Sequence, residues 1–189
     1  MYITVVAGLI FLTVAYFAFG QAAVSRNEVQ GAADAAALAA AHDARDQLGL
    51  TLNEGIADPE SWGDLLNGQA YSISEVCEAA QRFAANNGAD AQRCEQSAES
   101  ELRFTVKVRA REPVGDSVVP GTSGTHATAT ATAELQSRCD FDLVYPGDGA
   151  DTDPAPIELD CDGEDVVVDP SIDDPLPRLD ILFTVRLVE

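Results

Sequence analysis

The first twenty residues, MYITVVAGLIFLTVAYFAFG, contain no charged side chain. They run without a proline into the alanine-rich stretch QAAVSRNEVQGAADAAALAAAHDARDQLG, so one helix can continue through both. About twenty apolar residues at ~1.5 Å per residue are enough to cross the ~30 Å hydrocarbon layer of a membrane. The sequence therefore predicts a single-pass membrane helix in residues 1–20 that continues as a stiff stalk to about Leu48.

A secretory signal peptide is the alternative interpretation of the apolar segment. Ala18 and Gly20 would suit a cleavage site before Gln21. However, a signal peptide begins with a basic region, and the first basic residue of this chain, Arg26, lies beyond the apolar run. We therefore expect the segment to be retained.

Length and charge limit what the rest of the chain can be. We expect residues 1–49 to form the transmembrane and stalk helix, and residues 50–189 to form one extracellular α+β head. About 140 residues are enough for one compact domain with a hydrophobic core. The formal net charge of −21 excludes nucleic acid as a partner, because phosphate binding needs clustered Lys and Arg.

The four cysteines, Cys77, Cys94, Cys139 and Cys161, all follow the apolar segment. No pair has the C-x-x-C spacing of a zinc or redox site, and an even number beyond a membrane anchor indicates disulfides. Three pairings are open, with free buried thiols as a further alternative. Cys77–Cys94 and Cys139–Cys161 are favoured because each closes a local loop, which contributes about 3 kcal/mol in the chain-entropy model.

Local signals place two helices after the stalk. Asp58-Pro59 predicts the start of a short helix through Trp62 and Leu66. Ser72 with Glu75 forms a capping-box pattern that starts a second helix. Asn86-Asn87-Gly88 predicts its end, with Cys94 in the loop beyond it.

Alternating patterns predict the strands of a mainly antiparallel sheet. From Leu102 to Arg111, apolar residues alternate with basic or Thr residues, as in a half-buried strand with a basic outer face. The Thr-Ala alternation in residues 121–135 predicts a second strand, with an O-glycosylated tract as the alternative. A third strand is expected through residues 141, 143 and 145, and a closing strand from Leu179 to Leu187.

The stretch between Arg138 and Arg178 contains no basic residue and many acids, which predicts a long polar loop. It could be a solvated acidic surface, or it could contact the basic face of the strand at residues 102–111. A third interpretation is a calcium site, because acids two residues apart and a Gly that permits a tight turn suit oxygen ligation. The candidate calcium ligands are Asp160, Asp162 and Asp165.

Catalytic motifs are absent from the sequence. It contains no phosphate-binding loop, no HExxH and no recognisable nucleophile motif. Its histidines, His42 and His126, lie in the alanine helix and in the Thr-Ala strand, and nothing local supports a Ser/His/Asp site. We therefore expect that the protein is not an enzyme.

The segment from residue 20 to residue 45 resembles the N-terminal signature of TadE/TadG-like proteins of the tight-adherence (Tad) pilus system. Arg26, Gln30 and the run from Ala32 to Ala41 carry the resemblance, and the preceding YITVVAGLIFLTVAYFAFGQAA is similar to actinobacterial members in particular. The similarity implies a pilin-like fold, with a long N-terminal α-helix, short helices and a mainly antiparallel β-sheet head. One departure is Val5, where pilins usually carry a glutamate near the mature N-terminus.

The resemblance implies a structural subunit of a Tad-type surface filament, or of its assembly apparatus, that packs with copies of itself or with other pilin-like subunits. Small residues permit close approach of helices, so the alanine run suits such packing, with a simple spacer as the alternative. The expected packing residues are Val6, Leu9, Ile10, Val14, Phe17, Ala32, Ala33, Ala36, Ala37 and Ala40. The alternative function is a monomeric, membrane-anchored extracellular protein that binds calcium or a cell-envelope ligand.

Overall fold

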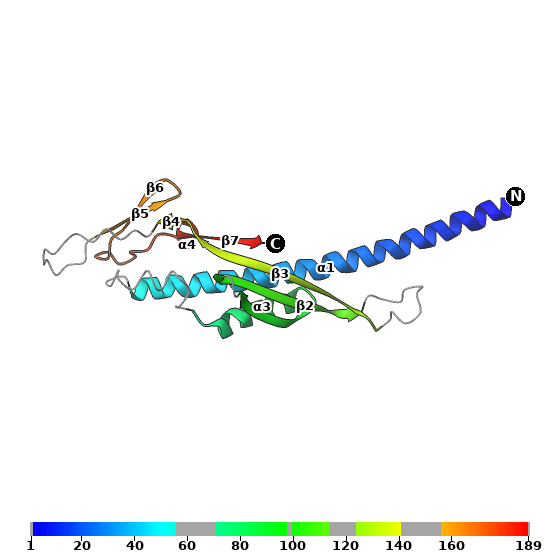
Figure 1. The fold of residues 1–189 in the computed structure, drawn as a ribbon, viewed down its shortest axis with the longest axis horizontal. Helices are drawn as coiled ribbons and strands as arrows, with labels where there is room; N and C mark the ends of the chain where they lie inside the picture. Colours follow the sequence, from blue (N-terminus) through cyan, green and yellow to red (C-terminus); the bar gives the residue numbers. More distant parts are fainter. Residues whose placement is uncertain (1, 56–70, 98–99, 114–123, 141–155, 189) are drawn as a thin grey trace.

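The computed structural model describes residues 2–55, 71–97, 100–113, 124–140 and 156–188 (Figure 1). Its helices are α1 (Tyr2–Glu54), α3 (Ile73–Asn86) and α4 (Leu179–Leu182). Its strands are β1 (Ala89–Ser97), β2 (Ser100–Pro113), β3 (His126–Ser137), β4 (Cys139–Asp140), β5 (Ile157–Cys161), β6 (Glu164–Val168) and β7 (Phe183–Val188). The predicted α+β class is confirmed. The helix expected after Asp58 and the strand expected at 141–145 lie outside the described residues.

Helix α1 is 53 residues long, or about 80 Å at ~1.5 Å per residue. No proline interrupts it, and alanine, the best helix former, dominates its middle. Its N-terminal part extends away from the rest of the molecule, and its C-terminal part lies along the sheet (Figure 1). The helix ends at Glu54, so residues from both sides of the expected boundary at residue 49 belong to it.

Helix α3 has the expected limits but not the expected cap. Ser72 is the N-cap residue, yet its hydroxyl lies 2.8 Å from the Ser74 hydroxyl and makes no cap hydrogen bond. The helix ends at Asn86, and Gly88 follows with a φ of +70°, a conformation that glycine adopts without strain. The predicted glycine stop is therefore confirmed.

The main sheet has four antiparallel strands in the order β1-β2-β3-β7. Phe104, Val106 and Val108 of β2 are fully buried and face α1, while Thr105 and Lys107 lie on the opposite, outer face. The alternation therefore predicts β2 and β3 correctly, and the Thr-Ala tract is a strand. In contrast, β1 forms where the sequence suggested a loop around Cys94, because β1 pairs along most of its length with β2.

The acidic stretch is not simply a loop. A second, smaller antiparallel sheet contains β4, β5 and β6 in that order, and β5 and β6 form a hairpin. Asp162 and Gly163 connect the two strands with φ values of 55° and 87°, the left-handed pair that favours a tight hairpin turn. Ile157, Leu159 and Cys161 alternate inward along β5 and are buried.

The closing strand is shorter than expected. Residues Leu179–Leu182 form a helical turn, α4, and β7 begins only at Phe183. Leu182 and Phe183 are consecutive and both buried, which a continuous strand with alternating sides could not achieve. The prediction of a strand from residue 179 is therefore wrong in its first half.

The head, as the structure shows it, also includes the C-terminal part of α1, and from here on the word means the molecule without residues 2–24. Two clusters of buried side chains form its core. The first cluster contains buried residues from the alanine-rich part of α1, from α3, and from the centres of β2 and β3. The second contains Leu48 and Leu52 of α1 with β5, β6, α4 and Phe183. Helix α1 contributes to both clusters, so its C-terminal part is the element on which the head is assembled.

Candidate functional site: the free segment of helix α1

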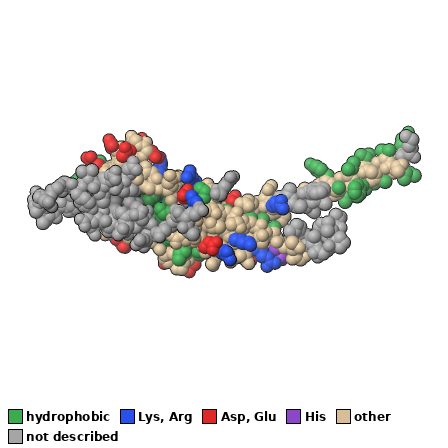
Figure 2. All heavy atoms as spheres, viewed as in Figure 1, with side chains coloured by type: hydrophobic (Ala, Val, Ile, Leu, Met, Phe, Trp, Pro, Cys, Tyr) green, Lys and Arg blue, Asp and Glu red, His purple; other side chains and the backbone are tan. Residues whose placement is uncertain are grey.

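Helix α1 consists of two segments with opposite surroundings. We call residues 2–24 the free segment and residues 29–52 the docked segment. Ten large hydrophobic side chains between Tyr2 and Tyr16 are exposed, from 47% for Val14 to 89% for Tyr2. Figure 2 shows hydrophobic side chains around the N-terminal end of the molecule. An apolar surface of this size is unusual on a protein that acts alone, and it marks an interaction site.

The apolar character of the free segment continues around the helix. The exposed side chains include Ile3, Phe11, Leu12 and Tyr16, which the expected packing face had missed. The sequence contained a signal for an apolar surface on all sides, because no charged residue lies between positions 2 and 24. A helix with a single apolar face would carry polar residues at helical spacing on its other face. An open hollow lined by Leu9, Leu12, Thr13, Ala15 and Tyr16 lies along the segment.

A polar group in the free segment is satisfied within the helix. The Thr13 hydroxyl donates a hydrogen bond of 2.8 Å to the carbonyl oxygen of Leu9. A buried hydroxyl without a hydrogen-bond partner costs about 1–3 kcal/mol. Because Thr13 already has a partner within the helix, a binding partner can cover this surface without that cost.

Four of the five expected packing residues in this segment are exposed: Val6 at 54%, Leu9 and Ile10 at 60%, and Val14 at 47%. The side chain of Phe17 lies outside the described residues. Residues 1–20 were also expected to cross a membrane. Within the part of the chain that the structure describes, no helix combines the length and the apolarity needed for a membrane span.

The alanine run lies inside the molecule, which corrects its expected role. Its predicted packing residues, Ala32, Ala33, Ala36, Ala37 and Ala40, have at most 1% of their surface exposed. They pack in the first core cluster with α3, β2 and β3. The small side chains do permit close approach, but to the protein's own sheet and helix α3. They are therefore not available for packing against another copy.

The end of the docked segment is also closely packed. A Cβ atom added at Gly49 would lie 2.5 Å from Cδ1 of Leu179, so the absence of a side chain at this position lets α4 approach α1. Gln47 accepts a hydrogen bond of 2.7 Å from the backbone N–H of Ser72 and so attaches the start of α3 to the same helix. These contacts hold the C-terminal part of α1 in the head.

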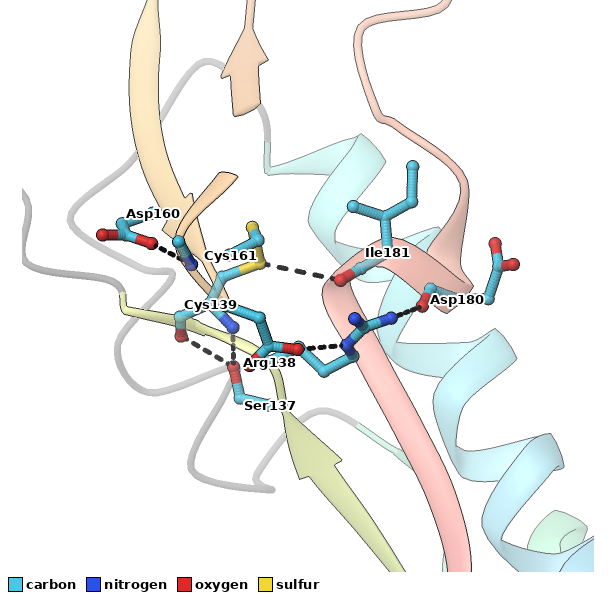
Figure 3. Close-up of a disulfide and its surroundings, with 9 residues drawn as sticks. Ser137, Arg138, Cys139, Asp160, Cys161, Asp180 and Ile181 are labelled. Carbon is cyan, nitrogen blue, oxygen red and sulfur yellow. Dashed lines mark hydrogen bonds and ion pairs between the residues drawn. A yellow bond between two sulfur atoms is a disulfide. The ribbon is translucent and has the colours of Figure 1, made fainter. Parts of the chain in front are cut away.

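Two disulfides stabilise the head, with the pairing that the sequence favoured. Cys77 of α3 is joined to Cys94 of β1, and Cys139 of β4 to Cys161 of β5. Figure 3 shows the second bridge beside Arg138. The Arg138 guanidinium donates to Asp162 at 2.7 Å and to the carbonyl oxygen of Asp180 at 3.0 Å. The disulfide and Arg138 together fix the β5–β6 hairpin to the end of the main sheet.

Two of the three candidate calcium ligands have partners within the protein. Asp160 accepts a hydrogen bond of 2.8 Å from the backbone N–H of Gly163, and Asp162 pairs with Arg138. Among the described residues, no group of three or more His, Cys, Asp or Glu side chains could hold a metal ion. The acids therefore shape and anchor the hairpin, and the Asp-Gly turn was the sequence signal that could have predicted it.

The outer face of β2 obtains its charge partners from neighbouring strands. Arg103 donates to Glu134 of β3 at 2.9 Å, and Arg186 of β7 donates to the other oxygen of the same carboxylate at 3.2 Å. Burial alone would raise the pKa of Glu134, but the two arginine hydrogen bonds outweigh it and hold the pKa below its ordinary value. Arg111 pairs with Asp90 of β1 at 2.8 Å. One expectation was that the acidic stretch after residue 138 would contact this basic face. The ion-pair partners described here come from β1 and β3 instead.

The two histidines lie in different surroundings. His42 lies on α1, and burial, followed by the neighbouring Arg45, lowers its pKa. The Nδ1 atom of His126 lies 2.9 Å from the carbonyl oxygen of Ala110 at the end of β2. Neither arrangement indicates catalytic chemistry, and the expectation of a non-enzymatic protein stays a prediction.

The comparisons with known proteins concern the same helix. Neither the curated proteins nor the solved structures contain a match to this chain. Residues 1–44, however, match a family model described as "Tad: Putative Flp pilus-assembly TadE/G-like". The match covers the free segment and the whole alanine run, and it includes no residue of α3 or of the sheets. In this N-terminal region, the chain is therefore similar to TadE/G-like proteins of Flp pilus assembly.

Proposed function

We propose that this protein is a structural, pilin-like subunit of a Tad-type surface filament or of its assembly apparatus, and that it packs with other subunits through the free segment of α1. The observation that carries the proposal is the free segment itself, with ten exposed large hydrophobic side chains beside a head that has a hydrophobic core of its own. The family match over residues 1–44 supports a role in Tad pilus assembly and a location at the cell surface or in association with the membrane.

The distribution of burial along α1 supports packing through the free segment alone. Burying apolar surface contributes about 25 cal/mol per Å², so a large side chain such as Leu9 contributes about 1.5–3 kcal/mol when covered. The alanines of the docked segment already contribute to the head. The predicted partners are therefore the free segments of other copies or of other pilin-like subunits.

The test compares one substitution at two exposed leucines of the same helix. Leu9 is 60% exposed in the free segment, and Leu50 is 67% exposed at the other end of α1. We expect Leu9→Glu to reduce the protein recovered in fibres sheared from cells by roughly 10- to 100-fold, because a covered carboxylate without a partner is costly. Leu50→Glu should leave the recovery within about twofold, since such a surface change alters stability little.

Mass spectrometry of the sheared fibres, with the mature N-terminus identified, measures this recovery directly. Circular dichroism of both variants checks that the head stays folded. If wild-type protein is absent from sheared fibres and remains with the cells as a monomer, the proposal is wrong. The alternative of a monomeric anchored binding protein would then be the better description.

A further inference from the structure

The outer face of the main sheet carries most of the positive charge of a strongly acidic chain. The chain has 11 Lys and Arg residues, and six of them lie on this face. The six are Arg93 of β1, Arg103, Lys107, Arg109 and Arg111 of β2, and Arg186 of β7. The cross-strand register places them together, because Arg93 lies opposite Lys107 and Arg186 lies opposite Glu134, the partner of Arg103. We call this surface the basic face.

Among the described side chains, the acids of the basic face do not neutralise it. Among its described side chains, only Asp90, Glu95 and Glu134 are acidic, which leaves a net charge of +3. Glu134 and Asp90 pair with arginines at the two ends of β2. Between them, Lys107 and Arg109 are exposed and form no ion pair with any described residue. Exposed threonines of β3, Thr128 and Thr130, lie directly opposite Arg109 and Lys107, so short side chains leave the two cations accessible.

The β5–β6 hairpin presents the opposite charge. Glu158, Asp160 and Asp165 are exposed on its outer face, and Asp160 lies directly opposite Asp165 in the register. Two like charges in a cross-strand pair destabilise a hairpin unless a cation lies nearby. Figure 2 shows acidic side chains gathered at the end of the molecule that carries β5 and β6, with basic side chains nearer its middle. We call this surface the acidic hairpin face.

The acidic hairpin face cannot reach Lys107 and Arg109 of its own chain. Lys107 lies opposite Thr130 of β3, and the hairpin is attached at Cys139. At ~3.3 Å per strand residue, the chain between Thr130 and Cys139 spans about 30 Å. The Cys139–Cys161 disulfide and Arg138 hold the hairpin at that distance. A contact of the hairpin with Lys107 and Arg109 therefore requires two copies.

We propose that the acidic hairpin face of one copy docks on the basic face of the next copy, with Lys107 and Arg109 against the carboxylates of β5 and β6. This inference rests on the proposed function, in which free segments bring copies side by side. Subunits of charge −21 repel one another, and the basic face is the described surface that can offset this repulsion. Because the contact joins two different surfaces, it is a head-to-tail interface that can repeat without closing.

A zero-length cross-link tests the contact, because Lys107 is the single lysine of the chain. A carbodiimide joins a lysine amine to a carboxylate as an amide, and the reagent takes up the water and becomes a urea. We treat sheared fibres of the full chain and identify the cross-linked peptides by mass spectrometry. We expect dimers in which Lys107 is joined to Glu158, Asp160 or Asp165.

Two sets of variants provide the controls. Lys107→Arg keeps the charge but removes the amine, so the cross-linked dimer should disappear while fibre recovery is unchanged. The variant K107E/R109E should lower fibre recovery about tenfold, since like charges placed opposite each other at an interface are costly. Adding E158K/D165K to it should restore recovery, because the charges are then exchanged rather than lost.

The outcomes separate this inference from the proposed function. Fibres in which Lys107 is joined only to other carboxylates, or to none, overturn the head-to-tail contact and leave the subunit role in place. The same applies if an anionic polysaccharide occupies the basic face, because Lys107 then stays unlinked to the hairpin. If wild-type protein is absent from sheared fibres and remains with the cells as a monomer, both proposals fail together.

Discussion

The free and docked segments of α1 are parts of one continuous helix, yet they differ in almost every other property. The free segment has large apolar side chains, such as Leu9 and Phe11, that are at least 60% exposed. The docked segment is rich in alanine, and Ala33, Ala36 and Ala40 are fully buried. Hydrophobicity alone therefore does not decide which part of α1 the head covers. The alanines let the protein's own sheet and α3 approach, and Leu48 and Leu52 fill the second core cluster, while the large side chains of the free segment are left exposed.

The largest expected effect comes from placing a large side chain in the docked segment. Ala36→Leu should lower the free energy of unfolding by about 1–3 kcal/mol, because extra volume in a closed core forces side chains and backbone to move. Ala7→Leu, at an exposed position of the free segment, should change it by less than about 0.5 kcal/mol. Thermal or denaturant unfolding of both variants measures the difference. Equal effects at the two positions would contradict the division of α1 into two segments.

The comparison also explains which features could be predicted from the sequence. Local patterns are sufficient where one face of an element is buried, as for the alternation of Phe104, Val106 and Val108 in β2 or the glycine stop after α3. The sequence favoured the two disulfides among three pairings, since each closes a short loop, and the structure has this pairing. The length of α1 follows from the absence of proline.

Other features depend on tertiary contacts that no local pattern contains. Alanine suits packing against any close neighbour, so the sequence of Ala32–Ala41 could not distinguish a second copy from the protein's own sheet. Strand β1 has no apolar alternation and forms because β2 pairs with it. The turn of α4 forms because Leu182 and Phe183 must both enter the second core cluster. The exposure of the free segment could therefore be expected from the sequence, whereas the burial of the alanine run could not.

A smaller effect on the free energy of unfolding is expected from a change at Glu134. Its carboxylate joins β2, β3 and β7 on the side of the sheet away from α1. Glu134→Gln should destabilise the head by about 1–2 kcal/mol at pH 7, since hydrogen bonds from two arginines to a charged group are lost. Glu78→Gln, at an exposed position of α3, is the matched control. Neither change should alter the helical signal of the free segment.

The pH dependence of the Glu134 contribution has a definite sign. Because the pKa of Glu134 is lower in the folded protein than in the unfolded chain, its contribution is fully present above the ordinary value of 4.5. It is lost as the pH falls through the folded pKa. Unfolding experiments at pH 7 and at decreasing pH should therefore show the difference between wild type and Glu134→Gln shrinking toward acid. A difference that grows below pH 4.5 would contradict the assigned arginine contacts.

The smallest effect compares two glycines of α1, one near the start of the docked segment and one near its end. At Gly31 an added Cβ meets no atom within 4 Å, so Gly31→Ala should stabilise the protein by about 0.5–1 kcal/mol through helix propensity. At Gly49 the same gain is opposed by Leu179, whose Cδ1 would lie 2.5 Å from the new atom. Gly49→Ala should therefore be neutral or destabilising, and the two melting temperatures should move apart. If both substitutions stabilise the protein equally, Leu179 can move aside freely, and α4 does not limit the approach of the head to α1.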